Sequence, residues 1–171
     1  DAADVNQRFA LSAAPTADPL AQAVHLALAL LQRSAPGGEL RVRSTIPLAG
    51  GMGSGAAVST AIVRAVAAWA GRTLPPATLS SLVYEVERLH HGTPSGIDNT
   101  VIAYAQPVWF VKGQAPQPFV IPHTFWLVIA STGIASPTRA TVGDVRRGWQ
   151  ADPASYERLF DEVAELVEAG R

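Results

Sequence analysis

The sequence predicts an α+β fold in which apolar helices predominate over a few short strands. Apolar side chains recur at helical spacing through residues 19–33, 54–70 and 75–90, which indicates helices with a buried face. Residues 39–46 alternate between apolar and polar, and residues 125–131 form a continuous apolar run; both patterns are typical of strands. Together these patterns favour the α+β class.

The composition is that of a folded domain with a nearly neutral surface. The 171 residues are 48% hydrophobic and 16% charged, which supports a sizeable core. With 13 basic and 14 acidic residues the formal charge is -1, so we expect neither a nucleic-acid partner nor a membrane partner. No cysteine occurs, which agrees with a cytoplasmic protein, and no apolar run reaches the roughly 20 residues that a membrane span requires.

The two ends of the chain predict that it belongs to a longer protein. It begins at Asp1 without an initiator methionine and ends at Arg171 within a helical pattern that has no stop signal. We therefore expect that a longer protein was trimmed or only partly resolved, and a trypsin-like cut after Arg171 would leave this terminus. The proline-rich stretch at residues 114–122 is the best candidate for a domain boundary.

The first elements lead into a glycine-rich loop. Residues 19–33 carry apolar side chains around most of a helix, which indicates burial. Residues 39–46 place Leu40 and Val42 on one face, as in a half-buried strand. The loop follows directly, and residues 54–70 then form a helix with so few polar positions that we expect it to be enclosed.

The helix predicted at residues 75–90 begins at a proline pair, which suits a first helical turn. Its apolar stripe leaves Glu87 at the border, roughly 100° from the centre, where the carboxylate can face a cleft. The remaining predicted elements are a short helix over residues 97–105, strands over residues 107–112 and 125–131, and helices over residues 138–149 and 153–169.

A strand, a glycine loop and a helix in this order form a usual device for holding phosphate. The first amides of a helix lack internal acceptors, the helix dipole favours an anion, and glycine lets backbone approach the ligand. A tight turn before a packed helix needs the same glycines, so the loop alone leaves both explanations open.

Other known motifs do not fit this loop. A P-loop needs a lysine followed by serine or threonine, and the only lysine of the chain is Lys112. Residues 51–56 match the dinucleotide pattern G-x-G-x-x-A, but no acidic residue follows in a second strand about 20 positions later. A hydrolase elbow fails because Met52 and Ala56 stand where glycines must flank the serine.

A second motif, ERLHHGTPSGIDN at residues 87–99, supplies two separated carboxylates. Phosphoryl transfer needs positioning, a metal to neutralise phosphate charge and a group to accept the alcohol proton. Glu87 is placed to bind magnesium, which prefers oxygen ligands, and Asp98 is placed to accept or orient the hydroxyl. The structural alternatives are that Glu87 pairs with Arg88 or Arg64 and that Asp98 caps a helix.

Read together, these motifs resemble those of the GHMP small-molecule kinases, and HGTPSGIDN is most similar to the mevalonate kinases. The resemblance is dense over residues 45–101 and weaker over residues 131–146. It implies a GHMP kinase fold, with most of a ribosomal-protein-like left-handed βαβ domain in residues 1–122 and the start of the C-terminal domain in residues 123–171. It implies ATP-dependent phosphorylation of a small-molecule alcohol, most similar to mevalonate phosphorylation in isoprenoid precursor synthesis.

The resemblance also assigns roles to individual residues. Asp98 is the expected catalytic base, and Glu87 and Ser54 are the expected Mg²⁺ ligands. The residues expected to wrap the ATP phosphates are Gly50, Gly51, Met52, Gly53, Ser54, Gly55 and Ala56. The residues expected beside the active site are His91, Gly92, Ser95 and Thr138, with His91 orienting the Gly92 turn.

Two departures from the family pattern leave alternatives open. Gly55 stands where the family usually has a second serine that helps to hold magnesium, and we expect Ser54, water or Glu87 to compensate. The family's first and third motifs do not occur in these residues, so we expect this chain alone to lack full activity. The alternatives are a kinase for phosphomevalonate or a sugar alcohol, or a non-catalytic nucleotide-binding relative, and a homodimer stays open as a partner.

Overall fold

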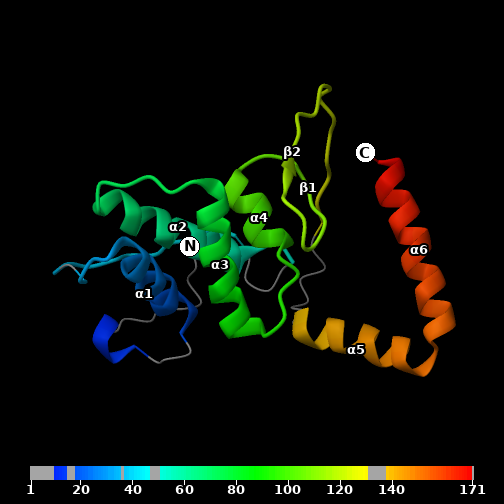
Figure 1. Ribbon diagram of the computed structural model, residues 1–171, viewed down its shortest axis with the longest axis horizontal. Helices are drawn as coiled ribbons and strands as arrows, with labels where there is room; N and C mark the ends of the chain where they lie inside the picture. The colour runs from blue at the N-terminus through cyan, green and yellow to red at the C-terminus, as the bar shows by residue number, and fades with distance from the viewer. Residues whose placement is uncertain (1–9, 15–17, 36, 47–50, 131–137, 171) are drawn as a thin grey trace. The chain divides into compact units, whose positions relative to one another are not determined.

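The structure, a computed structural model, describes residues 10–14, 18–35, 37–46, 51–130 and 138–170. It divides into two compact units, Asp1–Gly133 and Ile134–Arg171 (Figure 1). The predicted division into residues 1–122 and 123–171 concerns the domains of the family fold and stays a prediction.

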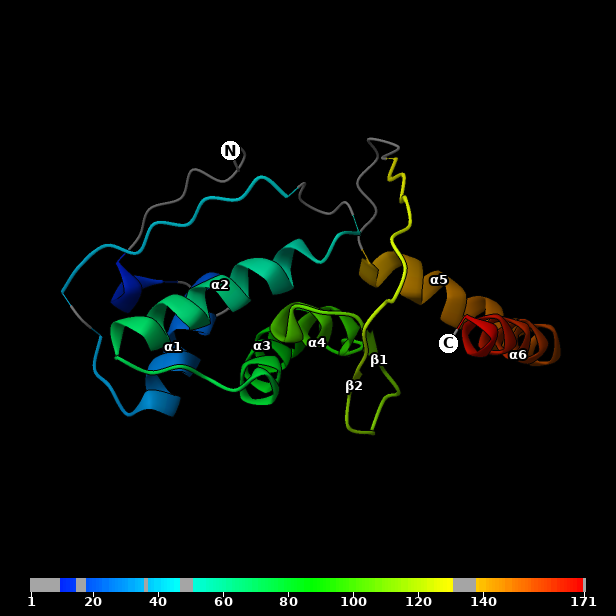
Figure 2. The same ribbon diagram turned by 90° about the horizontal axis from the view of Figure 1, so that it is seen from above.

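The first unit is a cluster of packed helices that agree closely with those expected from the sequence. The short 3₁₀ helix η1 (Leu11–Ala13) precedes α1 (Pro19–Leu31), α2 (Ser54–Trp69), α3 (Pro76–His91) and α4 (Ile97–Tyr104). Helix α2 contacts α1, α3 and α4, and α3 contacts α1 and α4, so α2 and α3 form the centre of the unit (Figure 2). The helices predicted at residues 19–33, 54–70, 75–90 and 97–105 are thus confirmed.

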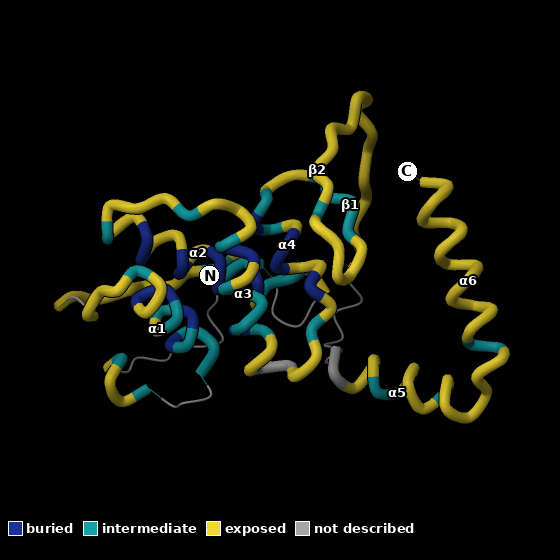
Figure 3. The backbone as a smooth tube through the Cα atoms, in the orientation of Figure 1, coloured by how far each residue is buried: buried dark blue, intermediate teal, exposed yellow. Residues whose placement is uncertain are grey.

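The core lies where these helices face one another (Figure 3). Val63, Leu79 and Val83 are almost fully buried there, and the burial of each such side chain contributes roughly 1.5–3 kcal/mol. The expected enclosure of α2 is correct for one face only, because Trp69 near its end is 51% exposed. The apolar stripe of α3 likewise ends before Leu89, which is 58% exposed.

A small antiparallel pair follows α4. Strand β1 (Val108–Trp109) pairs with β2 (Gln117–Pro118), with Val108 opposite Pro118 and Trp109 opposite Gln117. Strand β1 lies within the strand predicted at residues 107–112. The sequence does not predict strand β2, because the prolines of this stretch favour a domain boundary instead.

Two other predicted strands are wrong for the part of the chain that the structure describes. Residues 39–46 and 125–130 adopt no strand pairing there, and Trp126 and Val128 are 96% and 93% exposed. A strand needs a neighbour for its backbone hydrogen bonds, and the described ranges offer none to either segment. The structure is therefore rich in α-helix with a small sheet, which is compatible with α+β, and the left-handed βαβ arrangement stays a prediction.

The second unit contains two helices that contact each other, α5 (Thr138–Ala151) and α6 (Pro153–Ala169), in agreement with the helical pattern of the sequence. Asp152 caps α6 by accepting a hydrogen bond from the Ser155 amide at 3.2 Å. The Trp149 indole donates to Oε1 of Glu157 at 2.7 Å, which ties the end of α5 to the first turns of α6. Among the described helices of both units, none combines the length and the hydrophobicity that a membrane crossing demands.

Candidate functional site

The start of α2 presents backbone amides without a cap. Gly53 is the N-cap residue, its φ of 65° lies in the left-handed region that favours glycine, and no side chain of the described residues caps the helix. The first helical bond runs from the Ala57 amide to the Gly53 carbonyl at 2.9 Å. The amides of Ser54, Gly55 and Ala56 therefore lack an acceptor within the helix, which is the arrangement that binds phosphate.

Asp98 lies directly against this loop. A Cβ atom at Gly53 would stand 3.5 Å from Cγ of Asp98 and 3.3 Å from Cδ1 of Ile102, so α4 packs closely on a backbone that carries no side chain. Asp98 is exposed, in the first turn of α4, and the N-cap position there belongs to Gly96 without any side-chain cap. Asp98 therefore does not act as the N-cap of α4, which was the structural alternative expected for it.

Glu87 approaches the same helix start from α3. A Cβ atom at Gly55 would lie 3.1 Å from Oε1 of Glu87, whose side chain is half-buried. In the described part of the chain, both arginines of the alternative ion pairs have partners other than Glu87. Arg88 pairs with Glu85 at 2.8 Å, and that carboxylate raises the pKa of Arg88 through a hydrogen bond and its charge, while Arg64 donates to the Ala103 carbonyl at 3.1 Å.

The fold thus brings the glycine loop and both predicted acids together, with Asp98 beside Gly53 and Glu87 beside Gly55. Carboxylate oxygens of this kind suit magnesium, which commonly binds through one or two carboxylates, substrate phosphates and water. No cluster of three or more His, Cys, Asp or Glu side chains occurs among the described residues. The carboxylates of Glu87 and Asp98 fit an ion that takes most of its ligands from phosphate and solvent.

Other predicted site residues shape the turn between the two acids. Gly92 ends α3 with a φ of 85°, and its amide donates to the Arg88 carbonyl at 2.9 Å. The Ser95 hydroxyl accepts from the Ile97 amide at 3.2 Å and so helps to start α4.

Two further predicted residues lie in the glycine loop before α2. Gly51 has a φ of 71°, and Met52 beside it is 42% exposed.

Some of the expected residues fall outside the described part of the structure. Gly50 is one of them, and so are the side chains of His91 and Thr138. Their predicted roles stay predictions.

Sequence reasoning missed the residues that hold the HGTPSGIDN turn in place. A Cβ atom at Gly96 would lie 3.1 Å from Cζ of Phe110, so this glycine is required by the adjacent ring as well as by its φ of 92°. Ile102 packs on Gly53 in the same way. The available signal was positional, since Ile102 follows Asp98 by one helical turn and shares its face.

An uncapped helix start with two acids beside it, on a helical domain, is an arrangement suited to binding phosphate. The family model for the N-terminal domain of the GHMP kinases matches residues 20–106, and the chain belongs to this family.

Relatives named mevalonate kinase confirm the resemblance. The protein from Thermococcus sibiricus is 32% identical over 130 residues, which cover 76% of this chain and 38% of the relative. The protein from Pyrococcus furiosus is 29% identical over 152 residues, 88% of this chain and 44% of the relative. The protein from Arabidopsis thaliana is 29% identical over 136 residues, 71% of this chain and 35% of the relative. The chain spans less than half the length of these relatives, and no solved structure matches it.

Proposed function

We propose that this chain is part of an ATP-dependent kinase that phosphorylates mevalonate to 5-phosphomevalonate in isoprenoid precursor synthesis. The observation that carries the proposal is the placement of Asp98 against Gly53 and of Glu87 against Gly55 at the uncapped start of α2. The names of its relatives support mevalonate as the alcohol.

In this proposal each part of the site has one task. The amides of Ser54, Gly55 and Ala56 bind the ATP phosphates, with the other glycines of the loop, because they have no acceptor in the helix. Glu87 and the Ser54 hydroxyl hold Mg²⁺. When bound, the ion neutralises phosphate charge.

Asp98 handles the proton. Its carboxylate accepts the hydroxyl proton of the alcohol, or orients that hydroxyl, while the alcohol oxygen forms its bond to the γ-phosphorus. The bond between that phosphorus and the bridging oxygen breaks, and ADP leaves. The exposure of Asp98 leaves room for an alcohol beside the loop.

The expected partner is a small molecule, and the near-neutral charge of -1 supports neither nucleic acid nor membrane as a partner. The lack of cysteine fits a reducing compartment, so the proposed setting is the cytoplasm.

A second candidate function is nucleotide binding without catalysis. Gly55 favours it, because the residue offers no hydroxyl to a metal at the start of α2. Another alcohol, such as phosphomevalonate or a sugar alcohol, is the remaining alternative within the kinase class.

A coupled ADP-release assay on the full reading frame distinguishes these functions. We expect mevalonate-dependent ADP release that falls at least about 100-fold in Asp98→Asn, because general base catalysis contributes that much or more. Asp161→Asn, in an exposed position of α6, is the matched control and should keep full turnover. ATP binding in equilibrium dialysis, without turnover on any alcohol, would establish the non-catalytic function instead.

A further inference from the structure

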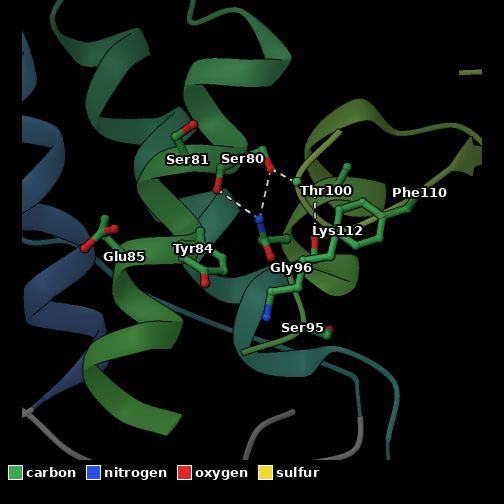
Figure 4. A pocket seen from close by; sticks show the side chains of 11 residues that line it. Ser80, Ser81, Tyr84, Glu85, Ser95, Gly96, Thr100, Phe110 and Lys112 are labelled. Carbon is green, nitrogen blue, oxygen red and sulfur yellow. Dashed lines mark hydrogen bonds between the residues drawn. The ribbon is translucent and has the colours of Figure 1, made fainter. Parts of the chain in front are cut away.

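A hollow lies on a different side of α4 from the phosphate loop. It occupies about 510 Å³ between α3, α4 and the β1 strand with its following turn (Figure 4). Cavities of a few hundred Å³ hold small organic ligands. The lining side chains that matter here are polar or aromatic: Ser81, Tyr84, Ser95, Asn99, Phe110 and Lys112.

A buried polar network forms one wall of the hollow. Asn99, only 4% exposed, donates from Nδ2 to the Ser80 carbonyl at 3.1 Å and to the Ser80 hydroxyl at 2.9 Å. The Ser80 and Thr100 hydroxyls are 3.2 Å apart, and Thr100 donates to the Gly96 carbonyl at 2.6 Å. Thr100 has one hydroxyl proton and uses it on Gly96, so Ser80 must donate to Thr100. The bonds therefore all run in one direction, from Asn99 through Ser80 and Thr100 to Gly96.

This direction fixes what Asn99 offers to a ligand. A carbonyl only accepts, so the amide nitrogen of Asn99 must face Ser80, and both of these bonds are donated there. Its Oδ1 takes part in none of these bonds. Because Asn99 lines the hollow, this oxygen is an acceptor that calls for a donor such as a hydroxyl group.

Two charged side chains line the hollow, Glu85 and Lys112, and they differ in whether an ion pair neutralises them. Arg88 pairs with the Glu85 carboxylate at 2.8 Å. Within the described part of the chain no carboxylate forms an ion pair with Lys112, the single lysine of the sequence. Figure 4 shows the Lys112 amine extending over the space between Tyr84 and Ser95.

We propose that this hollow binds a small organic anion that carries a hydroxyl group, with Lys112 holding the negative charge and Oδ1 of Asn99 accepting the hydroxyl. A phosphate ester and a carboxylate share this chemistry, since lysine binds either as a point charge. The site is distinct from the phosphate loop, because Asp98 contacts Gly53 whereas the next residue, Asn99, contacts Ser80 on α3. The proposal does not depend on the kinase function.

The single lysine makes a direct test possible. Reductive methylation with ¹³C-formaldehyde keeps the charge and labels Lys112 and the terminal amine of the 171-residue chain, giving one side-chain signal to follow by NMR. Glycerol 3-phosphate and glycerate are the probes, with inorganic phosphate and glycerol as the partial ligands. We expect a saturable shift of the Lys112 signal, with at least one hydroxylated anion binding about tenfold or more tightly than either partial ligand, because both contacts then form together.

Calorimetry on variants provides the second measurement. Lys112→Met should weaken binding of the better probe about tenfold or more, because the charged contact is lost. Arg41→Met removes another exposed cation of the same unit and should leave the affinity within about twofold. Glycerol 3-phosphate binding alone identifies a phosphate ester, and glycerate binding alone identifies a carboxylate. No saturable shift with either probe, or equal weakening in both variants, would overturn the proposal.

Discussion

Oε1 of Glu87 lies 3.1 Å from the position that a Cβ atom at Gly55 would occupy. This contact is tighter than ordinary van der Waals distance, so a larger residue at position 55 requires the end of the Glu87 side chain to shift by a few tenths of an ångström. The glycine at position 55, where the family pattern has a serine, thus leaves room for the close approach of this carboxylate. A carboxylate next to the first amides of α2 is well placed to share an ion with a bound phosphate.

Gly55→Ala tests this relationship. The added methyl group should displace the end of the Glu87 side chain by a few tenths of an ångström and weaken Mg²⁺ binding, by up to about tenfold. Gly55→Ser adds the same Cβ together with a hydroxyl ligand, so its Mg²⁺ affinity should exceed that of the alanine variant. Titration of Mg²⁺ in the presence of ATP, followed by calorimetry, gives both values. Equal affinities in the two variants would show that a hydroxyl at position 55 cannot reach the ion.

Glu87→Gln should raise the Mg²⁺ concentration needed for half-maximal turnover by about tenfold or more, since a charged ligand is replaced by a neutral one. Glu85→Gln is the matched control two residues away, because its carboxylate pairs with Arg88 on the surface. The measurement is ADP release against Mg²⁺ concentration at fixed ATP. An unchanged metal dependence in Glu87→Gln would remove this residue from the metal site.

The helices could be predicted because the signal for each is local. The stripe that contains Leu79 and Val83 repeats within one helix, and burial of that stripe needs only a neighbouring apolar surface. Residues 125–131 show the limit of such reasoning. An apolar run becomes a strand only beside another strand, and its own residues contain no information about whether one is near.

The candidate site could likewise be predicted only where its signal is local in the sequence. Asp98 and Glu87 stood out because a motif places them at a recognisable spacing from each other and after a glycine loop. The Ser80 network could not be predicted, because Ser80 meets Asn99 across a separation of 19 residues and a serine on a helix is usually a surface residue. Tertiary packing alone gives that serine its role.

Alanine variants of Gly53 and Gly51 separate two contributions to the unfolding free energy, the packing of the loop and its backbone conformation. Both have positive φ, 65° and 71°, so alanine at either position costs about 1–2 kcal/mol of unfolding free energy. Only at Gly53 would the new Cβ also meet Ile102 and Asp98, whereas at Gly51 no atom of the described residues lies within 4 Å. Urea unfolding should therefore show a larger loss for Gly53→Ala than for Gly51→Ala. Equal losses would mean that α4 does not pack on the loop.

Gly148 in the second unit is required by the packing of α6 on α5. A Cβ atom there would overlap the Tyr156 side chain, including its hydroxyl. Gly148→Ala should thus destabilise the pair of helices by about 1–3 kcal/mol, as overpacking does. Gly143→Ala lies in the same helix with only the flexible end of Arg147 3.4 Å away, and should be neutral or stabilising by up to about 1 kcal/mol. Urea unfolding of both variants measures the difference, and two variants of equal stability would contradict the observed contact.

Ser80 and Ser81 are neighbours on α3 with opposite surroundings. The Ser80 hydroxyl accepts from Asn99 and donates to Thr100 in a buried network, while the exposed Ser81 hydroxyl donates to the Ala77 carbonyl at 3.0 Å on its own helix. Ser80→Ala removes two hydrogen bonds of the buried network, the one that Asn99 donates to the hydroxyl and the one that the hydroxyl donates to Thr100, and should lower the unfolding free energy by about 1–3 kcal/mol. Ser81→Ala should change it by less than about 0.5 kcal/mol, as surface substitutions do. Because the two variants remove the same atom from adjacent residues of one helix, differences in helix propensity cancel, and the difference in urea midpoint reports the network alone.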